Sequence, residues 1–199
     1  MKFSLDDPLI AQIGKVLQPV DMTDDSHIPI GHGHRPASVL VPLIKRGEWR
    51  VLFTRRPMHM PTHAGQIAFP GGRTEIGETP AQGAIREMGE EVGVGAHDVH
   101  LMGRLASFNA TSDFRVTPFV GILNPAAKII PCQDEVEEVI EIPFTFFMDK
   151  ANHVPRTVEF EGNMLQLYDM PWPSTQNPHW HIWGMTAMMM YRLYQGLNL

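Results

Sequence analysis

The clearest pattern of hydrophobic and polar positions lies between residues 80 and 92. Thr79 is a good N-cap, Pro80 suits the first helical position, and Gly93 suits a left-handed residue that ends a helix. The segment therefore predicts an amphipathic helix over residues 80–92. On a helical wheel of about 100° per residue, one arc is apolar and should face the core. Its members are Ala81, Ala84, Ile85, Met88 and Val92.

Other segments show strand-like alternation or short apolar runs bounded by turn residues. The last two of these expected strands flank Gly162-Asn163 and should form a hairpin. Strands are expected over residues 38–44, 49–55, 66–69, 99–108, 116–123, 136–142, 154–161 and 164–169. Further helices are expected over residues 6–17, 144–149 and 185–194. This mixture favours an α/β fold in which helices cover both faces of a sheet.

The chain of 199 residues is long enough for one domain with a hydrophobic core. We expect an N-terminal helix and polar lead-in over residues 1–36, followed by the main domain over 37–199. A single cysteine, Cys132, excludes an internal disulfide framework and favours a reducing compartment. No apolar run has the length of a signal peptide or a membrane span. The sequence thus predicts a soluble cytoplasmic protein with no membrane partner.

The net charge of -6 argues against a nucleic-acid partner, because no basic stripe is available to neutralise phosphates. A small anionic substrate is compatible with this net charge if a metal ion and local arginines neutralise the negative charge of the substrate. The sequence leaves the oligomeric state open, with a homodimer among the options.

Glutamates crowd the last turns of the predicted helix, where like charges repel and the helix dipole favours cations. Glu87, Glu90 and Glu91 form an acidic arc beside the apolar one. A bound divalent cation would reverse both unfavourable effects, and hard oxygen ligands suit Mg²⁺ or Mn²⁺. Gly83 lies on this arc one turn earlier, so we expect it to leave room for a ligand. The alternative is a solvated acidic face without a ligand.

The same segment fits a longer pattern, G-x5-E-x7-R-E-U-x-E-E-x-G-U, where U is a bulky aliphatic residue. Its fixed positions are Gly72, Glu78, Arg86, Glu87, Glu90, Glu91 and Gly93. The pattern resembles the signature of the Nudix hydrolases. The resemblance implies a Nudix α/β/α sandwich with a mixed sheet and a loop–helix–loop that binds a metal ion and a diphosphate.

The resemblance also implies roles for individual residues. Glu87 and Glu91 correspond to direct metal ligands, and Glu90 to a third ligand or a residue just behind the ligands. Arg86 resembles an arginine that orients a glutamate by an ion pair, although an ordinary Arg86–Glu90 helix pair is compatible with that role. Glu78 is expected to order the loop or a metal-bound water.

The general base is left open by the sequence. Glu90 or Glu91 in the helix can fill the role. Many Nudix enzymes recruit a loop glutamate from the region of the acidic run at 134–138, where Glu135 is the first choice. The alternative for this run is a solvated entry to a strand.

A second motif precedes the first and narrows the substrate. Residues 52–72 resemble the pattern L-L-T-x-R-[SA]-x3-R-x3-G-x3-F-P-G-G of the coenzyme A diphosphatase branch of the family. Phe53, Pro57 and Pro61 depart from it, and Pro61 replaces an arginine. Arg55 or His63 can compensate for that loss. The matching positions are Leu52, Thr54, Arg56, Gly65, Phe69, Pro70, Gly71 and Gly72.

Within this motif, Arg56, Gly71 and Gly72 are expected to contact the substrate. The resemblance implies metal-dependent hydrolysis of coenzyme A or an acyl derivative to 3′,5′-ADP and 4′-phosphopantetheine or its acyl form. ADP-ribose, a dinucleotide or a nucleoside triphosphate is the alternative substrate. A non-catalytic module that binds diphosphates is a more remote alternative.

Overall fold

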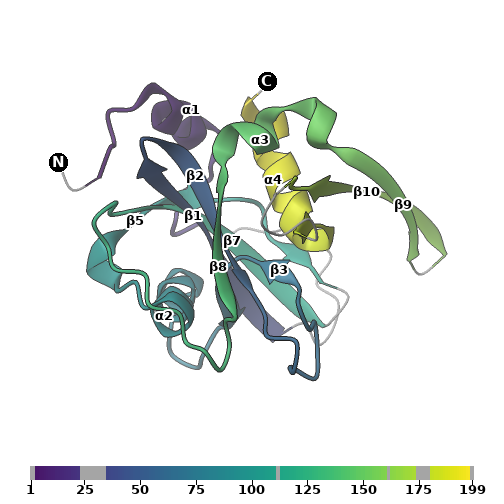
Figure 1. The fold of residues 1–199 in the computed structure, drawn as a ribbon, viewed down its shortest axis with the longest axis horizontal. Coiled ribbons are helices and arrows are strands. Elements are labelled where there is room, and N and C mark those ends of the chain that lie inside the picture. Colours follow the sequence, from purple (N-terminus) through teal and green to yellow (C-terminus); the bar gives the residue numbers. More distant parts are fainter. Residues whose placement is uncertain (1–2, 23–34, 111–112, 161, 174–179, 198–199) are drawn as a thin grey trace.

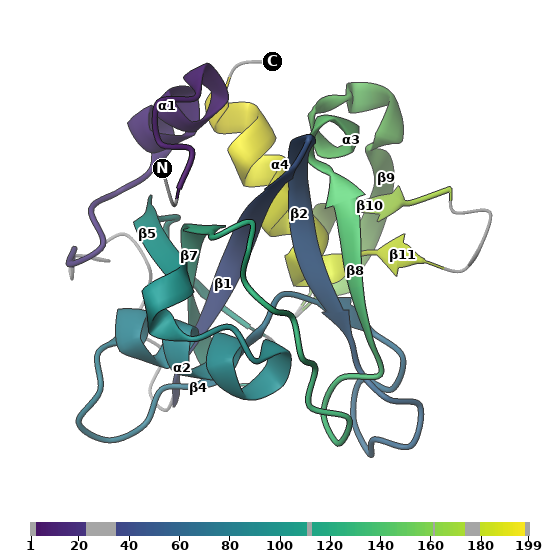
Figure 2. The same cartoon turned by 60° about the vertical axis from the view of Figure 1, so that its left-hand side comes forward.

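The computed structural model describes residues 3–22, 35–110, 113–160, 162–173 and 180–197. A mixed β-sheet runs through the middle of the molecule, with α2 on one side and α4 on the other (Figure 1). Figure 2, which turns the molecule by 60°, shows α1 and α3 at the same end as α4.

The sheet is built around three long strands, β1 (Arg35–Arg46), β2 (Glu48–Arg55) and β7 (Phe114–Leu123). β1 and β2 form a hairpin through Gly47, whose φ of 81° suits glycine. β1 pairs with β7 in parallel, and every other pairing is antiparallel among the described strands.

Shorter strands complete this mixed sheet. The main path runs β3-β2-β1-β7-β5, while β4 pairs with β1, β6 with β7 and β8 with β2. The bounds of these strands are β3 Ile67–Ala68, β4 Gly71–Arg73, β5 Val99–Arg104, β6 Phe108–Asn109 and β8 Glu138–Pro143.

The two faces of the sheet bury separate apolar clusters, because alternate side chains of a strand point to opposite faces. On one face, Leu40, Ile44 and Leu52 pack with the apolar arc of α2 (Pro80–Val92). On the other, Val41 and Phe53 pack with three further helices. These are α1 (Pro8–Val16), α3 (Phe144–Met148) and α4 (Gly184–Leu197). The expected α/β/α sandwich with a mixed sheet is confirmed.

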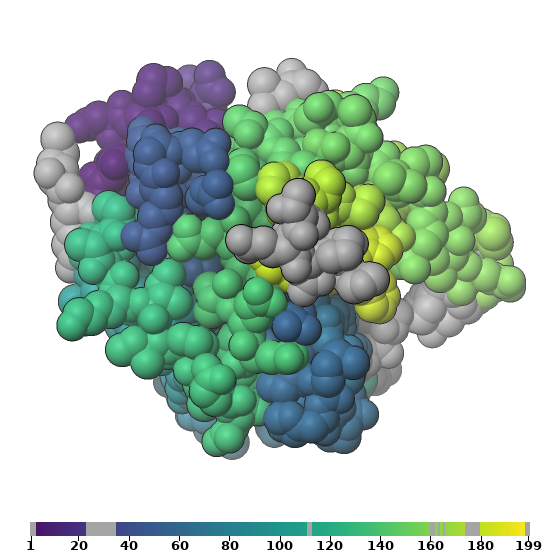
Figure 3. All heavy atoms as spheres, in the orientation of Figure 1, coloured from purple at the N-terminus to yellow at the C-terminus, as the bar shows by residue number. Residues whose placement is uncertain are grey.

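A second, smaller sheet has the strand order β11-β10-β9. The predicted hairpin is confirmed, with Gly162 at a φ of 76° in its turn. The hairpin projects from the molecule beside α4 (Figures 1 and 3). The strands are β9 Val154–Phe160, β10 Asn163–Pro171 and β11 His181–Ile182, and two short 3-10 helices span Ala96–Asp98 and Lys150–Asn152.

One expected strand is wrong in its extent. The segment 99–108 divides into β5, which ends at Arg104, and β6, which begins at Phe108. The buried guanidinium of Arg104 donates to the carbonyl of Leu105 and to Ser107 Oγ, 2.9 Å away. The residues between β5 and β6 therefore take part in a buried polar network instead of pairing as one continuous strand.

The structure describes only part of the N-terminal region. Ile10 and Ile13 of α1 are buried in the same cluster as α4. Most of the expected polar lead-in, residues 23–34, lies outside the described residues. The boundary at residue 36 stays a prediction. Within the described parts of the chain, every helix is too short or too polar to cross a membrane.

Candidate active site

Helix α2 has the bounds that the sequence predicts, and its caps fix the position of the glutamates. Thr79 Oγ1 accepts from the backbone N–H of Gln82, and Gln82 Oε1 accepts from the backbone N–H of Thr79. Gly93 has a φ of 75° and donates its N–H to the carbonyl of Gly89. Both ends of the helix are thus satisfied locally, and the acidic arc lies on its last two turns.

Glu91 is buried, with 7% of its surface exposed. Its carboxylate accepts from Thr54 Oγ1 at 3.3 Å and from the Gly71 N–H at 3.4 Å, both long distances. Burial, followed by repulsion from Glu87 and Glu135, raises the pKa of Glu91 to about 7. A buried carboxylate with such weak partners has spare capacity for a cation.

Glu87 lies one turn earlier and faces the backbone of β4. Burial raises the pKa of its carboxyl, and the charges of Glu90 and Glu135 add to this. A Cβ at Gly72 would lie 2.7 Å from Glu87 Cδ, a contact that would force the carboxylate to move. Glycine at position 72 therefore allows the loop to approach Glu87 closely.

Arg86 joins the loop to the helix. Its guanidinium donates to Glu78 at 2.9 and 3.2 Å, to Glu87 at 2.8 Å and to Glu90 at 2.7 Å. It also donates to the carbonyl of Arg73 at 2.9 Å. The expected ion pair with a motif glutamate is present, and Arg86 holds three carboxylates rather than one.

Glu78 ties down the loop that precedes the helix. It accepts from the backbone N–H of Glu75 at 2.6 Å, and the neighbouring Arg86 lowers the pKa of its carboxyl. This geometry fits the loop-ordering role expected for Glu78.

The expectation that Gly83 leaves room for a ligand is wrong. Gly83 is buried, and a Cβ there would lie 2.8 Å from Ser38 Oγ and 2.9 Å from Glu78 Oε1. The missing side chain lets α2 pack closely on β1 and on Glu78. The space is filled by protein because the acidic arc and the packing face overlap at this turn.

Glu135 lies in the loop before β8, and its side chain is exposed. It contributes to the raised pKa of both Glu87 and Glu91, so its charge lies near theirs. The loop is tied to the end of α2, because the N–H of Cys132 donates to the carbonyl of Glu91 at 2.9 Å. The N–H of Glu135 in turn donates to the carbonyl of Cys132. The structure thus brings three sequence-predicted acids into one electrostatic neighbourhood.

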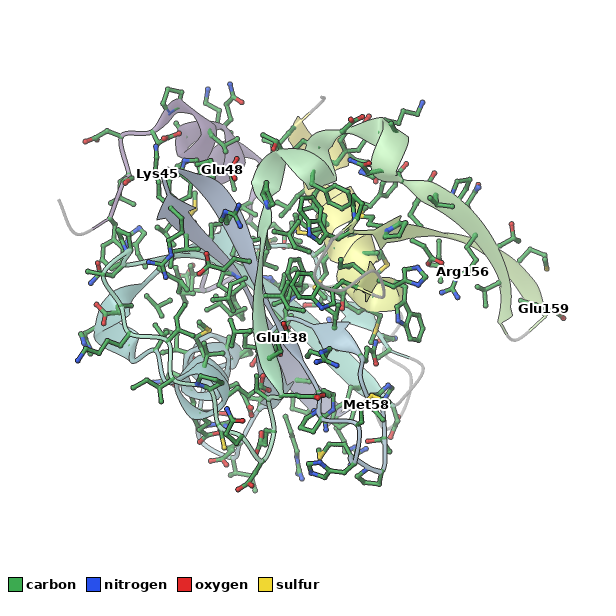
Figure 4. The ribbon with its side chains drawn as sticks, in the orientation of Figure 1. Lys45, Glu48, Met58, Glu138, Arg156 and Glu159 are labelled. Carbon is green, nitrogen blue, oxygen red and sulfur yellow. The ribbon has the colours of Figure 1, made fainter. Side chains whose placement is uncertain are left out.

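The basic residues of the second motif differ in their ion pairs, hydrogen bonds and exposure. Arg55 pairs with Glu137 at 3.3 Å and Glu138 at 3.1 Å. Arg56 is partly buried, and its Nε has no hydrogen-bond partner among the described residues. His63 is exposed and has a φ of 56°. In Figure 4, Glu138 and Met58 lie toward the same end of the sheet. Met58 belongs to the loop that also contains His63.

Sequence reasoning gave no role to Thr54, although it is a matching position of the second motif. Its hydroxyl is one of two groups that hold the carboxylate of Glu91, the other being the backbone of Gly71. The sequence contains a clue to this role of Thr54. Thr54 and the Gly71-Gly72 pair belong to one motif, and this motif ends where the helix motif begins.

The chemistry of this donor set fits a divalent cation. Within the described residues, no three acidic, histidine or cysteine side chains are already gathered around one metal position. Arg86 pairs with Glu87 and Glu90, whereas burial and the nearby charges of Glu87 and Glu135 raise the pKa of Glu91. A hard dication would offset the repulsion among these carboxylates, as Mg²⁺ and Mn²⁺ do with oxygen ligands.

A model of the NUDIX domain family matches residues 34–167, which include all the carboxylates described above. The chain belongs to the Nudix family. An uncharacterized Nudix hydrolase NudL from Yersinia pestis (strain Pestoides F) is 34% identical over 183 residues, covering 92% of this chain and 89% of that protein. The NudL protein of Yersinia pseudotuberculosis serotype O:1b has the same identity and coverage.

A solved structure with a TM-score above 0.5 agrees with this fold. A MutT/nudix family protein from Enterococcus faecalis has a TM-score of 0.53 at 16% identity, covering 86% of this chain and 64% of that chain. A binary complex of a C. elegans Ap4A hydrolase has a TM-score of 0.48 at 20% identity, covering 55% of this chain and 80% of that one. The family model and the NudL relatives identify the protein as a Nudix hydrolase, an enzyme that acts on diphosphate-containing substrates.

Proposed function

We propose that this Nudix hydrolase cleaves the diphosphate bond of coenzyme A or an acyl-coenzyme A. The products would be 3′,5′-ADP and 4′-phosphopantetheine or its acyl form. The observation that supports this proposal is the placement of the second motif, which resembles the coenzyme A branch. Thr54 and Gly71 bind the carboxylate of Glu91, and Gly72 lies against Glu87. The motif thus forms one wall of the carboxylate site.

We assign Glu87 and Glu91 as the ligands of Mg²⁺ or Mn²⁺, with Glu90 as a third ligand or a neighbour of the ligands. The metal, when bound, lowers the pKa of a water molecule and offsets charge on the phosphoryl oxygens. Arg86 fixes Glu87 and Glu90 through the ion pairs described above. Glu78 holds Arg86 from the other side and so orders the loop.

Two carboxylates compete for the role of general base. Glu135 is exposed and lies in a loop tied to α2, so a proton that its carboxylate accepts would pass readily to solvent. Glu91 is buried, and its pKa of about 7 without metal also suits a base at neutral pH. We assign Glu135 this role because Glu91 is needed as a ligand. Arg56 and the backbone of Gly71 and Gly72 would contact the diphosphate.

The alternative substrate is ADP-ribose or another nucleoside diphosphate derivative. It is favoured by Pro61, which stands where the branch pattern has an arginine. Arg55 is already paired with Glu137 and Glu138, which reduces its value as a replacement. His63 is exposed on the same loop and is available to an anionic group. A cytoplasmic location and a homodimer are further parts of the proposal, to be checked by localisation and by solution mass.

The test is hydrolysis of coenzyme A, acetyl-coenzyme A and ADP-ribose by the purified protein with Mg²⁺ or Mn²⁺, with the products separated by chromatography. We expect 3′,5′-ADP from coenzyme A at a kcat/KM well above that for ADP-ribose. Inert coenzyme A together with rapid cleavage of ADP-ribose would overturn the proposed substrate and leave the diphosphatase chemistry intact.

A further inference from the structure

A small hollow of about 180 Å³ lies beside the two glycines that contact the carboxylate site. Gly71 and Gly72 line it, as do Ala110, Phe114, Val116 and Met185. Gly72 also lies against Glu87, so this one residue borders both the hollow and the proposed site of hydrolysis.

Two arginines bring positive charge to this otherwise apolar hollow. Arg73 lines it and also lines the groove that contains Arg86 and Glu87. Arg35 places its guanidinium carbon 4.3 Å from the centre of the Phe114 ring. Both side chains are exposed, and among the ion pairs of the described residues none joins either guanidinium to a carboxylate. The hollow thus combines apolar walls with two uncompensated cations.

The position of both arginines follows from strand pairing. Arg35 lies opposite Phe114 in the parallel β1–β7 pair, and Arg73 lies opposite Ala37 in the β1–β4 pair. The carbonyl of Arg73 also accepts from Arg86, which fixes its backbone relative to the acidic site. The cations are therefore held on the sheet rather than on a loose loop.

We infer that this hollow binds the nucleoside end of the substrate and that Arg35 and Arg73 bind the 3′-phosphate of its ribose. The inference rests on the proposed function. Arg35 covers one face of the Phe114 ring, and the rest of this aromatic side chain lines the hollow. Met185, which is 39% exposed on α4, adds an adaptable apolar contact, and both residues suit a purine. Guanidinium groups are well suited to a phosphate.

The opposite orientation, with the pantetheine arm in the hollow, fits less well. A pantetheine arm is a flexible chain without an aromatic ring, so it would not use the aromatic side chain of Phe114 among the walls of the hollow. Arg35 and Arg73 would then face a neutral group. Placing the 3′-phosphate here also explains how an enzyme with Pro61 can recognise it, because the required charge comes from β1 and β4.

The experiment compares coenzyme A with 3′-dephospho-coenzyme A as substrates of the unaltered protein and of the variants Arg35→Gln and Arg73→Gln. We expect each variant to lower the ratio of kcat/KM for coenzyme A to that for the dephospho form by about tenfold, mainly through KM. Lys150→Gln removes an exposed positive charge in the 3-10 helix at 150–152 and should leave the ratio unchanged.

A binding measurement without turnover supports the same point. Calorimetry with 3′,5′-ADP and 5′-AMP should show tighter binding of the bisphosphate to the unaltered protein, and this difference should shrink in both arginine variants. Equal losses for both substrates and both nucleotides would overturn the inference while leaving the proposed function standing. Failure of the unaltered protein to cleave either coenzyme A form would instead overturn the proposed function.

Discussion

At the scale of single residues, the most informative group is the carboxyl of Glu91. It is buried next to Glu87 and Glu135, and its two hydrogen bonds are long. An arrangement of this kind is unfavourable for the fold alone, because burial and like charge both oppose ionisation. A cation bound at this position would restore the balance of charge, as the proposed metal site requires.

We predict that the metal-free protein loses stability as the pH rises. The pKa of Glu91 is 4.5 in the unfolded chain and about 7 in the folded protein. Below pH 4.5 both states are protonated, and between these values only the unfolded state releases its proton, so unfolding is favoured. Above the pKa of the folded state, the loss in the free energy of unfolding is constant, at about 3 kcal/mol from this group alone.

Urea unfolding in the presence of a chelator across this pH range measures the effect. Glu91→Gln should remove most of the pH dependence and make the metal-free protein more stable at about pH 8. A variant with the same pH dependence as the unaltered protein would show that Glu91 is not the titrating group.

The catalytic assignments predict a different pattern for activity. Glu91→Gln should lower kcat by orders of magnitude with the fold intact, and Glu135→Gln should lower it by about 10²–10⁴-fold as expected for a general base. The matched control is Glu159→Gln, an exposed acid on the projecting hairpin (Figure 4). Steady-state kinetics with circular dichroism on the same samples tests this. A fully active Glu135→Gln would return the role of base to the helix.

At the scale of elements, helix α2 was predictable to its ends, because its caps are local. Thr79, Pro80, Gln82 and Gly93 each act through residues within one turn. Gly83 was not predictable, because its role depends on Ser38, which lies far away in the sequence. A helical wheel shows which side chains share a face, but it does not show what packs against that face.

The two interior glycines of α2 provide a matched test. Gly83→Ala should destabilise the protein by about 1–3 kcal/mol, because its Cβ meets Ser38 Oγ at 2.8 Å. Gly89→Ala should stabilise it by up to about 1 kcal/mol, because its Cβ meets nothing closer than 3.8 Å and alanine favours the helix. Thermal unfolding of both variants measures the difference. Equal effects would show that α2 does not pack closely at Gly83.

Two strands also show the limit of local patterns. β4 contains Gly71 and Gly72, which have low strand propensity, and it forms because β1 supplies a pairing edge. The expected strand at 99–108 breaks because the polar partners of Arg104 occupy its middle. In both cases a distant contact overrides the local preference of the chain.

At the scale of the whole molecule, the fold joins segments that the sequence keeps apart. The two motifs meet at Glu91, and the loop at 132–135 is tied to the same helix end. The motifs predicted which acids lie together, and their roles stay a proposal. They did not predict the parallel β1–β7 pairing, which places Arg35 on Phe114 and creates the hollow next to Gly72. Strand order depends on long-range pairing, which no short pattern encodes.

The most direct test of the central claim, that the acidic arc of α2 is a divalent metal site, is a titration with Mn²⁺ followed by electron paramagnetic resonance. It compares the unaltered protein with Glu87→Gln, Glu91→Gln and the control Glu159→Gln. We predict that the first two variants bind Mn²⁺ at least about tenfold more weakly, since even residues that only support ligands change metal affinity by about 10–100-fold. The control should bind like the unaltered protein. Unchanged affinity in Glu87→Gln and Glu91→Gln would contradict the account.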